Sequence, residues 1–178
     1  MLLAERTVIP MHPTDIAYLP ETAAHEAAIE TINAQAFGPG RFARAAYKIR
    51  EGGPHDLSLS FVAVLGGKVI ASVRMTPIAA GEGRGHLLGP LAVTPEWKSK
   101  GVGRKLVALA LEAARAAGSG VVVLVGDEPY YGPLGFKRVP HGQMDMPRPV
   151  DPNRLLAAEL ATGATALMQG SVQHAALA

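Results

Sequence analysis

Glycines and basic side chains stand together at one predicted helix start, in the stretch KSKGVGRK over residues 98–105. The first backbone N–H groups of a helix have no intrahelical partner, and the aligned peptide dipoles add partial positive charge there. Gly101 and Gly103 have no side chain, so an anion can approach these N–H groups closely. The nearby cations are Lys98, Lys100, Arg104 and Lys105. The pattern predicts a site for one or more phosphate groups. The alternative is a tight turn beside a solvated basic face.

Two common nucleotide motifs can be compared with this stretch by spacing. A Walker loop requires GxxxxGK[ST], and no segment matches it. A dinucleotide fingerprint requires GxGxxG directly after a strand, but here the third position is Leu106 and seven residues separate Val93 from Gly101. Asp127, at the end of the next predicted strand, keeps a dinucleotide-binding oxidoreductase as an alternative.

A glycine–proline pair interrupts the apolar segment HLLGPLAV, residues 86–93. Because proline donates no hydrogen bond to a sheet and glycine weakens a strand, Gly89-Pro90 predicts a bulge. The bulge would splay this strand from the parallel strand VVVLV, residues 121–125, and expose backbone groups beside the basic helix start. An extended ligand with amides at one end and phosphates at the other would fit there, and coenzyme A has that layout.

The elements that must position these residues can be predicted from periodicity. Helices are expected over 21–38 and 41–53, and a hairpin over 56–78 turns at Gly66-Gly67. A loop follows over 79–85, and then comes the central strand over 86–93. A helix over 102–118 would bury one face, made of Val102, Leu106, Leu109, Ala110, Ala113 and Ala117. The strand over 120–126 then lies parallel to the central strand through a right-handed crossover.

The two ends of the chain give weaker patterns. Residues 6–19 favour an irregular first strand, residues 128–136 a short turn of helix, and residues 136–140 a further strand. The tail from residue 151 onward predicts a helix and a final strand. The whole chain, residues 1–178, is expected to be one α/β or α+β domain with a single mixed sheet.

Composition excludes several classes of function. With 48% apolar and 18% charged residues, the chain is typical of a soluble globular domain. A net charge of +2 is too small to indicate nucleic acid as a partner. The chain has no cysteine, and its six histidines show no metal-ligand spacing, so we expect no metal. Without a membrane-length apolar run or a secretory leader, we expect a cytoplasmic protein with no membrane partner.

The segments LAVTPEWKSKGVGRKLV and VVVLVGDEPYYGPLGF resemble the GNAT superfamily of acyl-CoA N-acetyltransferases. The segments LLGPLAV and YYGPLGF are most similar to its bacterial YhbS-like branch. The strong part of the resemblance covers residues 86–138. The resemblance implies the GNAT fold, a twisted, mostly antiparallel mixed sheet flanked by helices. Its central parallel strand pair is splayed at a β-bulge.

The resemblance also implies a site for acetyl-CoA. The family's (Arg/Gln)-x-x-Gly-x-(Gly/Ala) loop binds the pyrophosphate through backbone N–H groups and corresponds to Lys98 through Gly103, with Lys98 departing from the usual Arg or Gln. The expected loop residues are therefore Lys98, Ser99, Lys100, Gly101, Val102, Gly103 and Arg104. The splayed strand would contact pantetheine and hold the thioester carbonyl through Leu91, Ala92 and Val93.

Catalytic roles follow from the same resemblance. Tyr131 stands four residues before Gly135-Phe136, where the family often places the tyrosine that protonates the departing CoA thiolate. Tyr131 could instead simply pack beside Pro129 and Tyr130. His86 and Glu82 are candidates for the general base, although family members also act without one.

The acceptor side would be formed by the early helices and the hairpin, since these face the splay. Its expected residues are Phe37, Tyr47, Arg74 and Met75. Arg74 would either recognise an acidic substrate or be solvated. The expected function is transfer of acetyl from acetyl-CoA to a primary amine in a ternary complex. The alternative is a module that binds acyl-CoA or an acyl-carrier protein without turnover. A homodimer, paired through an apolar tail strand, is one possible assembly.

Overall fold

The computed structural model describes residues 12–178 and contains one large mixed sheet. Its strand order is β1-β2-β3-β4-β5-β8-β6, and β9 pairs with both β3 and β7. The strands are β1 (Ala17–Pro20), β2 (Phe61–Leu65), β3 (Lys68–Gly81), β4 (Gly83–Val93), β5 (Val121–Val125), β6 (Lys137–Arg138), β7 (Met144–Asp145), β8 (Leu155–Glu159) and β9 (Met168–His174). Most pairs are antiparallel, but β4 and β5 are parallel at the centre, as predicted.

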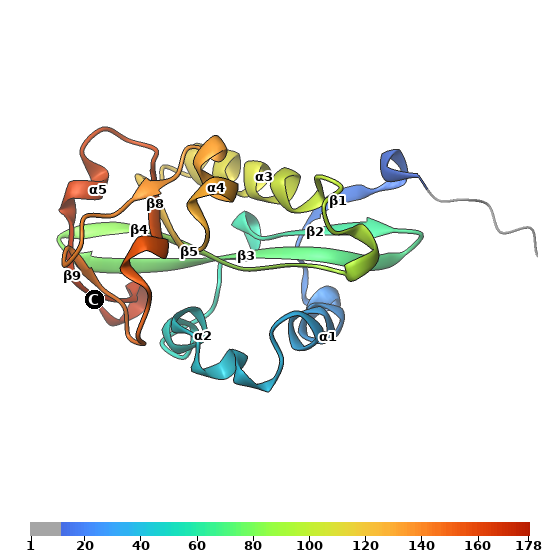
Figure 1. The fold of residues 1–178 in the computed structure, drawn as a ribbon, viewed down its shortest axis with the longest axis horizontal. Coiled ribbons are helices and arrows are strands. Elements are labelled where there is room, and N and C mark those ends of the chain that lie inside the picture. Colours follow the sequence, from blue (N-terminus) through green and yellow to red (C-terminus); the bar gives the residue numbers. More distant parts are fainter. Residues whose placement is uncertain (1–11) are drawn as a thin grey trace, which may run out of the picture.

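Helices cover both faces of the sheet (Figure 1). The helices α3 (Val102–Ala116) and α4 (Glu128–Tyr131) lie on one face, and α1 (Glu26–Phe37) and α2 (Ala45–Arg50) lie on the other. The short helix α5 (Ala164–Leu167) precedes β9, near the C-terminus. Single 3-10 turns connect these elements, among them η3 (Pro39–Ala43) between α1 and α2 and η5 (Pro95–Trp97) before α3.

The core has a layer on each side of the sheet. On the α3 side, Leu106, Val107 and Ala110 pack against the apolar side chains of β2 to β5. On the other side, Ile29 and Ile32 of α1 pack against Val62, Val69 and Ala92. Toward the C-terminal end, Ile49 of α2 packs with the buried side chains of β7, β8 and β9. The central strands are therefore apolar on both faces, which explains the long apolar runs in their sequences.

The predicted helices, the hairpin at Gly66-Gly67 and the strand–helix–strand unit are confirmed. The predicted loop over 79–85 is wrong, because β3 and β4 continue through it and turn tightly at Glu82. The tail holds the predicted helix and final strand as α5 and β9, but Leu155–Glu159 before them forms an additional strand, β8, that was not predicted. These five residues favour a helix by propensity, but pairing with β5 in the core decides their structure. The first predicted strand extends outside the described residues, and β1 begins at Ala17.

The buried face of α3 differs in part from the expected one. Val102, Leu106 and Ala110 are buried as predicted, whereas Ala117 is exposed and Leu109 and Ala113 are half-buried. Four other buried residues were not expected: Gly103, Val107, Leu111 and Ala114. The buried face of α3 is therefore turned about the helix axis relative to the predicted face, and it includes Gly103 in the first turn.

Candidate active site

The central strand pair opens immediately after two residue pairs. β4 and β5 are in register only at His86↔Val122 and Leu87↔Val123. On the other edge of β4, the register with β3 moves from Val73↔Leu91 to Met75↔Leu88. Two residues of β4 therefore stand opposite one residue of β3, which is the predicted bulge at Gly89-Pro90. The bulge and the parting of the strands coincide.

Gly89 holds the bulge in a conformation that side chains disfavour. Its φ is 134°, which L-residues rarely adopt, and this explains the need for glycine at the position. Its carbonyl oxygen accepts a hydrogen bond from Nη1 of Arg50, at the end of α2, over 3.2 Å. The same guanidinium lies over the ring of Tyr47, 4.2 Å from the ring centroid. The bulged strand is therefore attached to the helix that borders the cleft.

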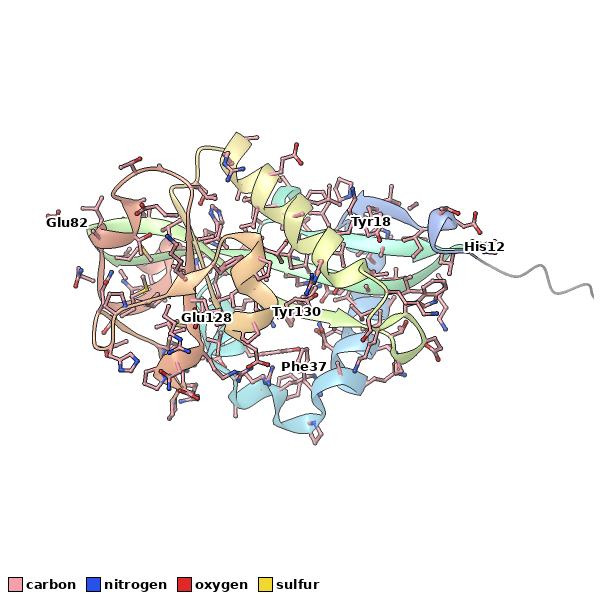
Figure 2. The ribbon with its side chains drawn as sticks, turned by 45° about the horizontal axis from the view of Figure 1, so that its top comes forward. His12, Tyr18, Phe37, Glu82, Glu128 and Tyr130 are labelled. Carbon is pink, nitrogen blue, oxygen red and sulfur yellow. The ribbon has the colours of Figure 1, made fainter. Side chains whose placement is uncertain are left out.

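A cleft of about 840 Å³ occupies the opening between the splayed strands. Its floor comes from β4 and β5, and its walls come from the α1–α2 region, from α4 and from the segment before β8. Figure 2 shows Phe37 and Tyr130 on two sides of this opening, one at the end of α1 and the other in α4. The floor is formed by Leu87, Leu88, Gly89, Pro90, Leu91, Leu124, Val125 and Gly126.

The basic helix entrance reaches the same cleft through Lys98, the one residue of the expected loop 98–104 that lines it. The first hydrogen bond inside α3 runs from the N–H of Lys105 to the carbonyl of Gly101, over 3.0 Å, so the N–H groups just before it belong to the unpaired first turn. Ser99 and Gly101 have φ of 60° and 85°, which turns the chain sharply into the helix. Lys98 lines the cleft, whereas Lys100 lies over the ring of Trp97. The geometry is a backbone cradle with exposed cations around it.

Gly103 is required by packing as well as by any ligand. A Cβ atom there would stand 2.7 Å from the hydroxyl oxygen of Tyr130. Tyr130 belongs to α4 and also carries Arg104 over its ring, at 5.2 Å from the centroid. The glycine was predicted to let an anion approach. The structure adds that it lets α4 approach the first turn of α3.

The three expected residues of the splayed strand point in alternating directions. Leu91 lines the cleft, and Val93 packs beside it against the α3 side of the core. Ala92 is buried on the opposite face, against Ile29 and Ile32 of α1. Only the backbone of Ala92 is therefore available to a ligand in the cleft.

Tyr131 lies in the cleft at the end of β5. Its ring makes edge-to-face contacts with Tyr130 and Phe136, with centroids 4.7 Å and 5.8 Å apart. A Cβ at Gly126 would collide with this ring, so the glycine lets Tyr131 lie against the strand end. Burial, reinforced by Tyr130 and Asp127, raises the pKa of Tyr131 to about 12. The phenol is thus a proton donor over the whole physiological pH range.

The two base candidates lie away from the cleft. Nδ1 of His86 is 2.8 Å from Oγ of Ser119, in the turn before β5, and burial lowers the pKa of the imidazole. Glu82 is exposed at the turn between β3 and β4, and Figure 2 shows it far from Phe37 and Tyr130. Neither side chain lines the cleft. His86 lies only a few residues before the bulge, but its side chain contacts Ser119, at the end where β4 and β5 are still paired.

Arg74 is neither solvated nor in the cleft, so both expectations for it are wrong. The residue is 3% exposed, and its guanidinium donates to the carboxylates of Glu21, at 2.8 Å, and Glu26, at 2.7 Å. Glu21 also accepts from Nε2 of His55, at 2.9 Å. Burial pushes the pKa of Glu21 upward, but the hydrogen bonds from His55 and Arg74 outweigh it and hold the pKa below 4.5. This is a buried ionic network of the fold.

Met75 was expected to line the acceptor side of the cleft, and this prediction is also wrong. Its side chain is fully buried in the core on the α3 side of the sheet, outside the cleft. Phe37 and Tyr47, in contrast, both line the cleft. Arg74 and Met75 are consecutive residues of β3, so their side chains face opposite sides of the sheet, and neither side chain reaches the opening.

Several residues of the cleft were not predicted. Arg44 lines it next to Tyr47, and its guanidinium lies 4.5 Å from the ring centroid of Phe37. The far wall is formed by Met146, Pro149, Val150, Asp151 and Arg154. Asp127, the residue behind the dinucleotide alternative, is paired with Arg154 at 3.1 Å. The three-residue spacing of Arg44 and Tyr47 in the predicted helix could have indicated a shared face. No local pattern marks the far wall.

Among residues 12–178, no three His, Asp or Glu side chains come together as a metal site. Within the same residues, no helix is long and apolar enough to cross a membrane.

Comparison with known sequences adds two findings. The profile of the Acetyltransferase (GNAT) family matches residues 25–136. The Escherichia coli K12 protein YjhQ, an uncharacterised N-acetyltransferase, is 31% identical over 113 residues. This match covers 61% of the present chain and 62% of YjhQ, which is less than two thirds of the relative's length.

Solved structures share the fold over nearly the whole chain. The E. coli protein YhbS, a GNAT family N-acetyltransferase crystallised with CoA, superposes with a TM-score of 0.75 and 24% identity, over 90% of this chain and 89% of its own. A GNAT family acetyltransferase from Brucella melitensis, crystallised with acetyl-CoA, has a TM-score of 0.67 and 25% identity. That match covers 92% of this chain and 98% of the Brucella protein.

Proposed function

This chain belongs to the acetyltransferase (GNAT) family, and from that premise we propose that it transfers an acetyl group from acetyl-CoA to a primary amine by direct attack in a ternary complex. The observation that carries the proposal is the opening of β4 from β5, which leads into a cleft that Lys98, just ahead of α3, also lines. One groove thus offers strand backbone for an amide arm and helix N–H groups for a diphosphate.

The residues present fit the co-substrate. The first-turn N–H groups of α3, preceded by Ser99 and Gly101, would hold the diphosphate, with Lys98, Lys100 and Arg104 adding charge. The backbone from Leu91 to Val93 would pair with the pantetheine arm and offer N–H groups to the carbonyl oxygen of the thioester. In the related E. coli and Brucella structures, CoA and acetyl-CoA are the bound molecules, which supports this assignment.

Tyr131 would complete the chemistry. As the amine nitrogen bonds to the acetyl carbon, the bond from that carbon to sulfur breaks and the thiolate leaves. The Tyr131 hydroxyl would donate a proton to the sulfur, and its raised pKa keeps that proton in place until then. The amine must give up a proton in turn. The side chains of His86 and Glu82 lie outside the cleft, so neither would act as the base. Water would accept this proton instead.

A thiol-release assay tests the proposal. The protein would be incubated with acetyl-CoA and a panel of amines, and free CoA would be followed against a control without amine. We expect release that depends on the amine, together with acetylated product by mass spectrometry. If calorimetry shows tight acetyl-CoA binding while no amine increases release, the chain is a binding module and not an enzyme. Binding of NADH in place of acetyl-CoA would instead support a dinucleotide site.

A further inference from the structure

The α1–α2 wall of the cleft carries three groups that face the same opening: the Phe37 ring, the Arg44 guanidinium and the Tyr47 side chain. The guanidinium of Arg44 lies over the Phe37 ring, with its central carbon 4.5 Å from the ring centroid. This contact fixes a flexible side chain against a rigid surface and leaves its N–H groups available at the edge of the cleft.

The Tyr47 hydroxyl is buried and has no hydrogen-bond partner among the described residues. Buried hydroxyls in folded proteins are almost always paired, so an unpaired one requires an explanation. Tyr47 lines the cleft, and Arg50 lies against its ring and donates to Gly89. The buried hydroxyls of Ser72, Thr76 and Thr94 are also unpaired within residues 12–178, but none of these residues lines the cleft, so Tyr47 is the one of the four that a molecule in the cleft would pair.

Arg44 has no acidic partner within 4.0 Å in the part of the chain that the structure describes, whereas its neighbour Arg41 is engaged. Arg41 lies over Phe42 in the same way, at 4.3 Å, but donates to the carbonyl of Gly38 and approaches Glu30 at 4.0 Å. Arg41 does not line the cleft. Of these two similar arginine–phenylalanine pairs, Arg41 is held by contacts within the fold, although its Nε is unpaired among the described residues, whereas Arg44 lines the opening.

The opposite wall carries two acids, and one oxygen of each has a partner. Asp127 pairs with Arg154 at 3.1 Å. Asp151 accepts a hydrogen bond from the backbone N–H of Asn153 at 2.9 Å. The α1–α2 wall, in contrast, offers hydrogen-bond donors to the cleft, the guanidinium of Arg44 and the hydroxyl of Tyr47.

We propose that the acceptor is an amine that also carries an oxyanion group, a carboxylate or a phosphate, bound by Arg44 and Tyr47 on the α1–α2 wall. Guanidinium and hydroxyl donors match such oxygens, and an arginine can bind two of them at once. The inference rests on the proposed acetyl transfer and names the class of amine that the site selects. Phe37 serves as the platform that holds Arg44.

Matched pairs of amines test the proposal. Each pair changes the second group, phenylalanine against phenylalaninamide and O-phosphoethanolamine against ethanolamine, and because this group also shifts the pKa of the amine, kcat/KM is compared per unprotonated amine. We expect kcat/KM at least about tenfold higher for the anionic member of one pair, and the two pairs distinguish carboxylate from phosphate. Arg44→Gln should bring that ratio close to one without changing the KM for acetyl-CoA, and Tyr47→Phe should lower the ratio in the same direction. Arg41→Gln is the matched control and should leave the ratio unchanged.

Three results would overturn the inference: equal kcat/KM within both pairs, an equal effect of Arg41→Gln, or a loss in Arg44→Gln that falls on acetyl-CoA alone. Calorimetry on the CoA-loaded protein measures the same preference without turnover. A retained tenfold preference in binding with no acetylated product would reject the acetyl-transfer function and support the anion site. Acetylation of neutral amines and their anionic counterparts at equal rates would support the function and reject the site.

Discussion

The guanidinium of Arg50 at the end of α2 donates a hydrogen bond to the carbonyl of Gly89 in β4, with a distance of 3.2 Å. These residues are 39 positions apart in the sequence. The bond connects the helix that borders the acceptor side of the cleft with the strand bulge that opens it. Arg50 therefore acts as a positioning residue, because the peptides after Gly89 are the ones proposed to face the thioester.

Replacing Arg50 should lower turnover more than co-substrate binding. A hydrogen bond from a charged donor contributes about 1.5–3 kcal/mol, so Arg50→Met is expected to reduce kcat by about tenfold or more. The KM for acetyl-CoA should stay within about twofold of the wild-type value, since the helix entrance is untouched. Arg50→Lys should recover part of the loss. Lys48→Met is the control on the same helix, because Lys48 pairs only with exposed Glu51. Equal losses in kcat and in acetyl-CoA affinity would argue against positioning.

Tyr131→Phe tests the proposed proton donor. The substitution keeps the ring contacts with Tyr130 and Phe136 and removes only the hydroxyl. General acid catalysis contributes about 100-fold or more, so we expect kcat to fall by that order while the affinity for CoA is unchanged. Tyr18→Phe, in β1 and outside the cleft, is the matched control. Undiminished turnover in Tyr131→Phe across the amine panel would remove this residue from the mechanism.

The raised pKa of Tyr131 predicts how activity and stability respond to alkaline pH. Because the folded-state pKa is about 12 and the ordinary value is 10.0, the folded protein holds this proton more tightly than the unfolded chain. Its contribution, roughly 2–3 kcal/mol, is complete below pH 10 and is lost as the pH rises toward 12. Chemical denaturation at pH 9 and pH 11 should show a smaller loss of stability for Tyr131→Phe than for the wild type. The rate should show no fall below pH 10 due to this group.

Gly103→Ala should disturb the helix entrance through Tyr130. The new Cβ would stand 2.7 Å from the Tyr130 hydroxyl, so the Tyr130 side chain, α4 or the first turn of α3 has to shift. We expect a loss of about 1–3 kcal/mol in unfolding free energy and weaker CoA binding by calorimetry.

Removal of the obstructing hydroxyl provides the control for that substitution. In the double variant Gly103→Ala/Tyr130→Phe the nearest remaining neighbour would be Val93, at 3.6 Å, which is an ordinary contact. Stability should therefore recover relative to Gly103→Ala alone, which a double-mutant cycle would measure. If the double variant is as unstable as the single one, crowding by Tyr130 is not the cause.

Breaking the buried ionic network should destabilise the fold but leave the preference of the enzyme among amines unchanged. Arg74→Met leaves the buried carboxylate of Glu21 without its main partner, which is expected to cost about 3–5 kcal/mol in thermal or chemical unfolding. The lowered pKa of Glu21 gives stability that is present above pH 4.5 and is lost as the pH falls through the folded-state value. The variant should therefore lose less stability on acidification than the wild type. A change in amine preference at unchanged stability would show that Arg74 has a role in the site.

Much of the fold follows from local patterns. The helix over 102–118, the hairpin at Gly66-Gly67 and the parallel strand pair are marked by periodicity and by turn glycines, and all three are present. The bulge at Gly89-Pro90 is predictable for the same reason, because the backbone limits of these two residues act within the strand itself. Leu155–Glu159 is the counterexample, since the same residues suit a helix and a strand and pairing with β5 decides between them.

The sequence by itself determined the basic glycine-rich helix entrance and the strand interruption beside it, because both are properties of consecutive residues and their backbone. Tertiary structure alone decided which side chains share the cleft. Arg74 pairs with Glu21, which is 53 residues away in the sequence, and His86 contacts Ser119. Arg44 and Tyr47 line the same cleft as Tyr131. A buried charge or hydroxyl is fixed by the partners that pack around it, and those partners come from distant parts of the chain that no local spacing identifies.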